Sequence, residues 1–425
     1  MIRCRTVSNK DPGKVDEAEF ERFRKLVLNS YPTVVEKAVP EIISGGMLFR
    51  IKGRSSEAPA VFMSHFDVVE AGGEGWEVSP FEGVVKDGFV WGRGAIDTKC
   101  TLLSIMEAAE ALLKDGFVPQ NDIYFAFGCN EEIAGPCAEM IAKTLEERGV
   151  KPAFVLDEGG MIYHVAHKLF PYDLAAVGIA EKGPMDVLFT VRGESGHASR
   201  PPQHTAVGRL AADIARIEKR QFPMKIVKAN DEMAKALAPF LPKITRPVLR
   251  HLSAFGPLVF AIAKKNNTAA AFFRTTIAFT QLKGSDGANV LPEEASAVAN
   301  VRLSQWVKSD EAVAYMLKSA KDRCLSAEII NKSEATSTSP FDGKYKDIIE
   351  KAVKAIFPGT IVAPYLMIGG TDSRFYDGFC PCIYKFAPVL TEGGLLKTVH
   401  SDNERISVDN LGKMIEFFTT VIGSL

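Results

Sequence analysis

The chain has 425 residues, of which 46% are hydrophobic and 24% are charged, and its formal net charge at pH 7 is −1. A chain of this length and apolar content can bury a large core and is expected to divide into two domains. Its near-neutral charge, with no basic stripe or patch interleaved with aromatic residues, disfavours a nucleic-acid partner.

The sequence shows neither a secretory signal nor a membrane span. Residues 1–5 lead into no apolar segment of the kind that a secretory signal contains. The apolar run from Leu252 to Ala263 is too short to cross a bilayer and contains Pro257, so no membrane partner is expected. The seven cysteines form no CxxC pair, which favours core thiols in a reducing compartment. We therefore expect a cytoplasmic protein.

From the N-terminus to about residue 182, predicted strands and helices alternate, which indicates an α/β layer with a largely parallel sheet. An apolar strand pattern runs from Ala60 to Val69. It carries His65 and Asp67, which are two positions apart and therefore share one face. A metal-binding imidazole commonly donates its other N–H to a carboxylate, so His65 suits a ligand and Asp67 its orienting partner. A buried histidine that is merely hydrogen-bonded to the aspartate is the alternative.

Asp97 directly precedes a predicted helix. The segment Trp91 to Lys99 is followed by apolar residues at helical spacing, namely Leu102, Leu103, Met106, Ala109 and Leu113. Asp97 is therefore either a metal ligand or an ordinary helix N-cap, a role that aspartate often takes.

Two adjacent carboxylates, Glu131 and Glu132, follow the predicted buried strand from Asp122 to Gly128. Neighbouring side chains of an extended segment point in opposite directions, so one carboxylate could bind a metal while the other carries a proton. A solvated surface pair is the alternative. Further on, an apolar strand from Pro152 to Leu156 ends in Asp157 and Glu158.

Residues of about 183 to 335 follow a different pattern, with predicted elements in the order β-α-β-β-α-β. A polar tract from Ser333 to Ser339, ending at Pro340, forms the return linker. After it the α/β pattern resumes, and His400 lies in a loop before the last predicted helix. The candidate ligands thus lie beyond the ends of strands, where open α/β sheets bind their ligands.

In their order and joint spacing, these segments resemble the aminoacylase and carboxypeptidase S family of two-zinc metallohydrolases. The similarity extends from Thr6 to the His400 loop and is greatest to the carboxypeptidase S branch, through residues 155–160, 369–374 and 403–406. It implies a zinc-exopeptidase-like α/β catalytic domain, residues 1–182 and 336–425. A ferredoxin-like α+β lid or dimerisation domain, residues 183–335, would be inserted into it.

The resemblance also implies a role for each site residue. His65 and Asp157 would hold one metal and Glu132 and His400 the other, with Asp97 bridging the two. Glu131 would be the general base and Asp67 the residue that orients the first histidine. Glu158 could replace its neighbour Asp157 as the ligand. Carboxylates and imidazoles without thiolates suit two zinc ions, with cobalt or manganese as alternatives.

Three further residues are matched to substrate contacts. His197 corresponds to the family's lid histidine, which stabilises the oxyanion, frequently in the active site of the partner subunit. Arg374 corresponds to the group that binds the free carboxylate of the substrate, and Asn289 to an auxiliary contact from the lid. Surface or structural roles are the alternatives for His197 and Arg374.

We therefore predict metal-dependent hydrolysis of an amide or peptide bond that releases an amino acid with a free carboxylate. The substrate would be an N-acyl amino acid or a short peptide, and a homodimer through the lid domain is expected. A non-catalytic metal-binding or regulatory member of the same fold is the alternative. Residues of about 221 to 272 are more apolar than a minimal lid requires, and either line an acyl-group pocket or pack the lid.

Overall fold

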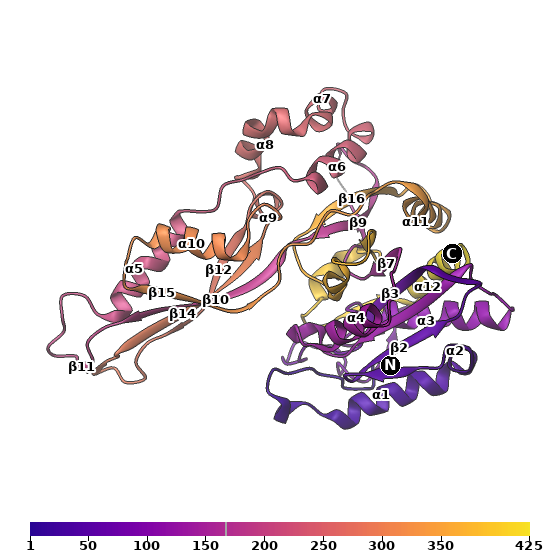
Figure 1. Ribbon diagram of the computed structural model, residues 1–425, viewed down its shortest axis with the longest axis horizontal. Helices are drawn as coiled ribbons and strands as arrows, with labels where there is room; N and C mark the ends of the chain where they lie inside the picture. The colour runs from indigo at the N-terminus through magenta and orange to yellow at the C-terminus, as the bar shows by residue number, and fades with distance from the viewer. Residues whose placement is uncertain (166–167) are drawn as a thin grey trace.

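A mixed sheet forms the centre of the larger part of the molecule in this computed structural model, which describes residues 1–165 and 168–425 (Figure 1). At its centre, four adjacent strands run parallel to one another, namely β6, β3, β7 and β17. Parallel strands end at the same edge of a sheet, so the segments that follow them are brought together. The strand order is β1 (Glu41–Ile43), β2 (Gly46–Ile51), β6 (Asn121–Gly128), β3 (Ser55–His65), β7 (Phe154–Asp157), β17 (Ile383–Lys385), β9 (Asp173–Glu181) and β16 (Ile361–Met367), with β8 (Ile162–His164) beside β9.

Both faces of this sheet are covered, which explains why its central strands are apolar without interruption. On β3, Phe62 faces one core while Val61 and Met63 face the other. The second core is closed by α4 (Cys137–Glu147). The first core is closed by α1 (Glu17–Ser30), α2 (Pro32–Ala38), α3 (Lys99–Lys114), α11 (Gly343–Ile356) and α12 (Val408–Gly423).

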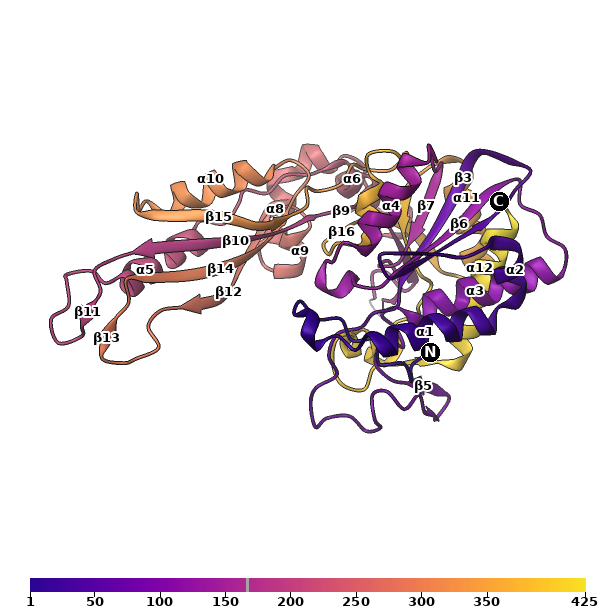
Figure 2. The same ribbon diagram turned by 60° about the horizontal axis from the view of Figure 1, so that its bottom comes forward.

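A separate antiparallel sheet extends away from this body (Figures 1 and 2). Its strands lie in the order β12 (Thr276–Lys283), β14 (Glu294–Leu303), β10 (Gly183–Arg192) and β15 (Leu325–Lys332). One face packs on α5 (Ala206–Lys219) and α10 (Ser309–Ala320), so buried and half-exposed residues alternate along β10. Along the chain these elements follow the β-α-β-β-α-β order that the sequence predicts.

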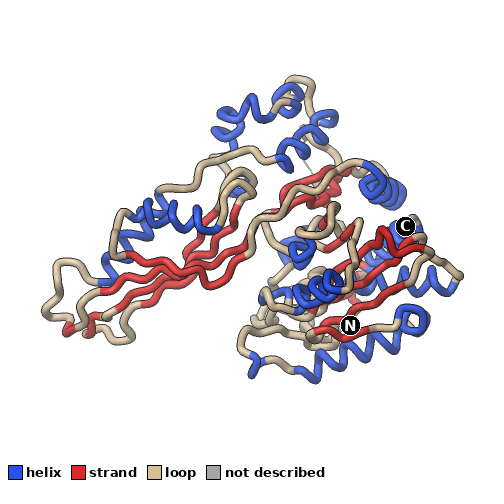
Figure 3. Tube along the Cα trace, in the orientation of Figure 1, coloured by secondary structure: helices blue, strands red, loops and turns tan. Residues whose placement is uncertain are grey.

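An all-helical insert separates α5 from β12 (Figure 3). It contains α6 (Lys228–Leu237), α7 (Arg246–Arg250), α8 (Gly256–Ala263) and α9 (Asn267–Ala271). The first of these helices packs against β16 of the large sheet, and Phe222 at the start of the insert stacks on Tyr315 of α10, so the insert contacts both parts of the molecule. Within the described residues, no helix combines the length and apolar character needed to cross a membrane.

A small three-stranded sheet places the residues before the last helix next to the loop that precedes α3. Strand β18 (Arg405–Ser407) pairs with β5 (Phe89–Trp91), which pairs in turn with β4 (Val85–Lys86). The pairing of β18 with β5 places the residues just before β18 beside the loop that contains Asp97. His400 is brought to the same place from a segment three hundred residues further along the chain.

Candidate metal centre

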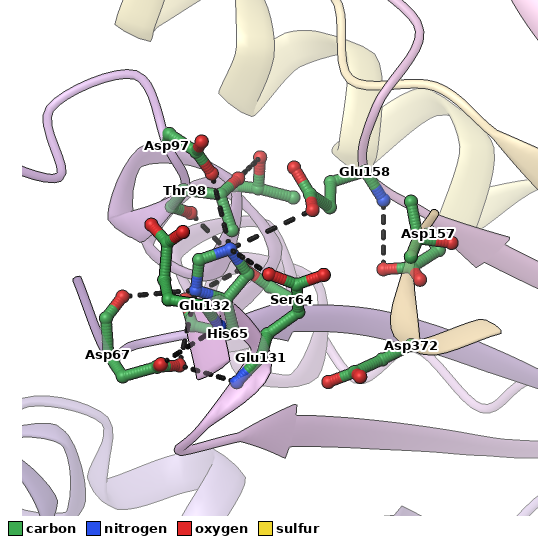
Figure 4. A network of polar contacts seen from close by, with 12 residues as sticks. Ser64, His65, Asp67, Asp97, Thr98, Glu131, Glu132, Asp157, Glu158 and Asp372 are labelled. Carbon is green, nitrogen blue, oxygen red and sulfur yellow. Dashed lines mark hydrogen bonds and ion pairs between the residues drawn. The ribbon is translucent and has the colours of Figure 1, made fainter. Parts of the chain in front are cut away.

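Carboxylates and imidazoles gather at the edge of the large sheet where β3, β6 and β7 end (Figure 4). His65 is the last residue of β3, and Glu158 follows β7. Glu131 and Glu132 follow β6 but lie in a 3-10 helix, η2 (Glu131–Ile133), rather than in the extended segment that the sequence analysis assumed. Both carboxylates nevertheless point at the same cluster, because a tight turn brings adjacent side chains closer together than a strand does.

Asp97 lies between the two histidines. Its Oδ1 is 3.2 Å from Nε2 of His65, and its Oδ2 is 2.9 Å from Nε2 of His400. Nε2 of His400 is also 3.1 Å from Oε2 of Glu132. Thr98 rather than Asp97 occupies the N-cap position of α3, so the alternative reading of Asp97 as a helix cap does not describe the structure. Each oxygen of Asp97 faces a different imidazole, which is the arrangement expected of a bridging carboxylate.

His65 is oriented by Asp67. Nδ1 of His65 lies 3.0 Å from the backbone oxygen of Asp67 and 3.3 Å from its Oδ1. Donation of the Nδ1 proton to these oxygens leaves the lone pair of Nε2 aimed at the carboxylates of the cluster. Asp67 is fully buried, and its carboxylate also accepts the backbone N–H groups of Glu131 and Glu132 at 3.1 Å and 3.2 Å.

The structure separates Asp157 from Glu158. Oε1 of Glu158 lies 3.7 Å from Nε2 of His65. The two oxygens of Asp157 instead accept the backbone N–H groups of Glu158, at 2.9 Å, and Ser373, at 2.8 Å. The side chain predicted as a ligand at Asp157 is thus not brought into the cluster, because backbone donors already use its carboxylate, and Glu158 occupies that position.

Among the described residues, two overlapping groups have ligand atoms close enough to share a metal ion. One consists of His65, Asp97 and Glu132, and the other of His65, Glu131 and Glu158. Within each group, the possible ligand atoms lie within 4.8 Å of one another. His400 joins the first group through its contacts with Asp97 and Glu132.

The electrostatics of the cluster favour a cation. Burial raises the pKa of Glu131 and of Glu158 well above the usual range, and neighbouring carboxylates raise both further. Hydrogen bonds to Asp97 and Glu132 raise the pKa of His400 to about 10. Oε1 of Glu132 is buried and has no hydrogen-bond partner among the described residues. A nitrogen and oxygen donor set of this kind, with one oxygen unsatisfied, fits divalent cations such as zinc.

Glu404 holds the loop that carries Asp97, a role that the sequence analysis did not identify. Its carboxylate accepts the backbone N–H groups of Ile96 at 2.8 Å and of Asp97 at 3.1 Å. It also accepts the N–H of Gly94 at 3.1 Å and a hydrogen bond from Nη1 of Arg93 at 2.8 Å. The sequence singled out Glu404 only as part of residues 403–406, one of the three segments through which the chain resembles the carboxypeptidase S branch.

Arg374 lies in the wall of the same region. It belongs to η5 (Asp372–Tyr376), and its Nη1 donates to the backbone oxygen of Thr371 at 2.6 Å. Its Nη2 is 3.7 Å from Oδ1 of Asp372, a buried acid drawn beside Glu131 in Figure 4. Burial raises the pKa of Asp372 to about 7. The sequence analysis did not identify Asp372 as a site residue either.

His197 and Asn289 lie together, but not at the metal centre. Strand β11 (Gly196–His197) pairs with β13 (Val290–Leu291), and the N–H of Ala198 donates to the backbone oxygen of Asn289 at 2.9 Å. Figures 1 and 2 show this pair of strands at the tip of the extended sheet, away from the body that contains the cluster. Within one chain, therefore, neither residue reaches the metal centre.

Comparisons with known proteins agree with this arrangement. A sequence model described as Peptidase family M20/M25/M40 matches residues 61–424. The human N-fatty-acyl-amino acid synthase/hydrolase PM20D1 is 33% identical over 419 residues, covering 96% of this chain and 83% of that protein. The probable carboxypeptidase S-like 2 of Dictyostelium discoideum is 30% identical over 432 residues, covering 98% and 82%.

Solved structures show the same fold. The M20 family metallo-carboxypeptidase Sso-CP2 from Sulfolobus solfataricus superposes with a TM-score of 0.72 at 16% identity, covering 99% of this chain and 96% of that one. Human carnosine dipeptidase 1 superposes with a TM-score of 0.68 at 14% identity, covering 100% and 93%. Both the catalytic body and the extended sheet are therefore within the aligned fold.

Replacement of Glu404 by alanine tests the role of this buried acid. The Glu404→Ala substitution leaves Nη1 of Arg93 and three backbone donors without their acceptor, so the free energy of unfolding should fall by about 3–5 kcal/mol. Urea denaturation of EDTA-treated protein measures this change without a contribution from bound metal. The control Glu77→Ala removes a carboxylate that is 58% exposed, and its effect should stay within about 0.5 kcal/mol. A loss below about 1 kcal/mol for Glu404→Ala would contradict the role.

Proposed function

The chain belongs to peptidase family M20/M25/M40, and from this we propose that it is a metal-dependent hydrolase that releases an amino acid with a free carboxylate from an N-acyl or peptide precursor. The main support is the cluster in which Asp97 lies between His65 and His400, with Glu131 beside it. A non-catalytic relative would have no need to keep Glu131 buried among these ligands.

We assign the cluster to two zinc ions. His65 and Glu158 would hold one ion, Glu132 and His400 the other, and Asp97 would contact both. Glu158 takes the place predicted for Asp157, because only Glu158 lies against His65. When bound, such ions act as Lewis acids that polarise an amide carbonyl and lower the pKa of water.

Glu131 is proposed as the proton carrier. It lies within 4.0 Å of Nε2 of His65, and its backbone N–H is fixed by the carboxylate of Asp67. Glu131 would accept a proton from the attacking water and pass it to the amine nitrogen as the amide bond breaks. Burial raises the pKa of Glu131, which makes its carboxylate a stronger base and lets it hold the accepted proton until the amine leaves.

The free carboxylate of the substrate is assigned to Arg374. Among the described residues, the buried guanidinium donates one short hydrogen bond, from Nη1 to the backbone of Thr371, and its Nη2 lies 3.7 Å from Oδ1 of Asp372. A planar fork of N–H donors pairs well with a carboxylate. The names of the relatives, an N-fatty-acyl-amino acid hydrolase and a carboxypeptidase S-like protein, share this feature of an amino acid product.

His197 and Asn289 are proposed to act in the site of a second subunit. Both lie at the tip of the extended sheet, and His197 is exposed to solvent. In a homodimer formed through this sheet, His197 of the partner subunit would donate a hydrogen bond to the developing oxyanion. We further propose a reducing, cytoplasmic location, which the seven unpaired cysteines support.

Conversion of Glu131 to glutamine tests the proposed reaction. Wild-type protein loaded with zinc should hydrolyse a simple N-acyl amino acid, and Glu131→Gln should lower kcat by about 100-fold to 10,000-fold, because the proton carrier is lost. Metal analysis should find an unchanged zinc content, since Glu131 is not an assigned ligand. If wild-type protein bound zinc but hydrolysed no N-acyl amino acid or dipeptide, the proposed function would be wrong.

The role of Arg374 can be tested without changing the protein. A substrate whose free carboxylate is converted to an amide loses a charge-assisted contact with the guanidinium, so its kcat/KM should be lower by roughly 10- to 100-fold. In Arg374→Met the two substrates should be cleaved with similar kcat/KM. Equal values for acid and amide with the wild-type enzyme would contradict the assignment.

A mixture of two inactive variants tests whether His197 acts across subunits. His197→Ala and Glu131→Gln should each be nearly inactive, but a mixed dimer would contain one site with an intact Glu131 and an intact His197 of the partner subunit. After dissociation and reassociation of an equal mixture, about a quarter of the wild-type activity should return, since random pairing restores one site in four. No return of activity, with mixed dimers verified by mass, would exclude action across subunits.

A further inference from the structure

The helical insert differs from the rest of the chain in its charge. Residues 233–275, from α6 to the start of β12, contain no aspartate or glutamate but seven lysines and arginines. The whole chain has 51 basic and 52 acidic residues, so the remainder carries 44 basic against 52 acidic ones. A positive segment in an otherwise negative protein indicates a surface for a negatively charged partner.

Apolar side chains are exposed on the same insert. Phe255, Leu258 and Ile262 follow one another at helical spacing along η4 (Leu252–Phe255) and α8, and are 38%, 52% and 63% exposed. The opposite side of α8 packs inward, with the rings of Phe260 and Phe273 at 5.7 Å. Phe255, Leu258 and Ile262 therefore form an exposed apolar stripe, and Ile244, before α7, is 87% exposed as well.

Cations flank this apolar stripe along the chain. Lys264 and Lys265 directly follow α8, and Lys243, Arg246 and Arg250 lie just before or within α7. Among the described residues, none of these five side chains forms an ion pair with a carboxylate. Arg246 is bonded only to backbone oxygens of its own segment, Leu241 and Pro239. The positive charge around the stripe is thus not neutralised within the chain.

We propose that this part of the insert docks on an anionic phospholipid surface. The stripe of Phe255, Leu258 and Ile262 would enter the headgroup region, while the surrounding lysines and arginines would contact lipid phosphates and carboxylates. With eight residues, α8 is too short to cross a bilayer, so the protein would bind at the surface. The absence of a membrane span in the sequence predicts no membrane partner, but surface binding needs only an apolar face flanked by cations.

Two other occupants fit the surface less well. In a symmetric dimer through this patch, the lysines and arginines of both copies would face one another and repel. The acyl chain of a substrate would need the apolar residues but not five cations. The proposal is independent of the hydrolase function, because none of the residues involved belongs to the metal centre.

Vesicle binding by the full chain tests the proposal. Without substrate and at about 0.15 M ionic strength, the protein should sediment with vesicles that contain about 30% phosphatidylserine, and at least about tenfold less with pure phosphatidylcholine vesicles. Lys264→Gln combined with Lys265→Gln should weaken binding about 25-fold, since each charge near such a surface contributes about fivefold. Leu258→Gln combined with Ile262→Gln should weaken it by about tenfold or more.

Matched double variants on other exposed surfaces serve as controls. Lys318→Gln with Arg323→Gln removes two exposed cations from the extended sheet's helical layer and the loop after it. Val85→Gln with Ile330→Gln replaces two apolar side chains that are 66% and 54% exposed. Both pairs should bind vesicles as the wild type does, and thermal unfolding should show that every variant is folded.

Several results would overturn the proposal. Absence of binding to anionic vesicles, or equal binding to neutral ones, would do so, as would equal losses in the control variants. If the insert variants instead changed the oligomeric mass without any vesicle binding, the surface would be a contact between copies of this chain. If they only raised KM for long-chain substrates in vesicle-free buffer, the insert would be an acyl-group pocket.

Discussion

Three buried carboxylates that are not themselves assigned as metal ligands fix the positions of the residues that are. Asp67 accepts the N–H groups of Glu131 and Glu132, and Glu404 accepts that of Asp97. Asp157 does the same for Glu158. A buried carboxylate that accepts several backbone donors fixes the loop that supplies them. Each acid that faces the cluster is therefore held through its own backbone by another acid behind it.

This arrangement concentrates negative charge in a small buried volume. Glu131, Glu132, Glu158 and Asp97 all lie close to His65 or His400, and burial with mutual repulsion raises the pKa of Glu131 and Glu158. Divalent cations relieve such repulsion, so metal binding and the local fold are expected to support each other. The backbone bonds to the outer acids keep the ligands together while that repulsion acts.

The extended sheet and the helical insert lie outside the metal centre and have separate proposed roles. The extended sheet carries His197 and Asn289 at its tip, far from the centre of its own chain, so any contribution to catalysis depends on a second subunit. The helical insert packs on the large sheet through α6 and on helix α10 through Phe222, yet it leaves an apolar stripe and unpaired cations exposed. Neither the tip of the extended sheet nor the exposed face of the insert contacts the metal centre of its own chain. We propose instead that the first contacts a second subunit and the second a lipid surface.

The sequence by itself determined the residue types of the centre and the order of its elements. Apolar strand patterns followed by His65, Glu131 and Glu132 were sufficient, because parallel strands bring their carboxyl ends to one edge. Only the tertiary structure decided between Asp157 and Glu158, since the donor that engages Asp157 comes from Ser373, 216 positions away. Glu404 was hidden for the same reason, because its partners at residues 93–97 are distant in the chain. Local patterns report which side chains point inward, whereas long-range hydrogen bonds decide which of two neighbouring acids faces the metal.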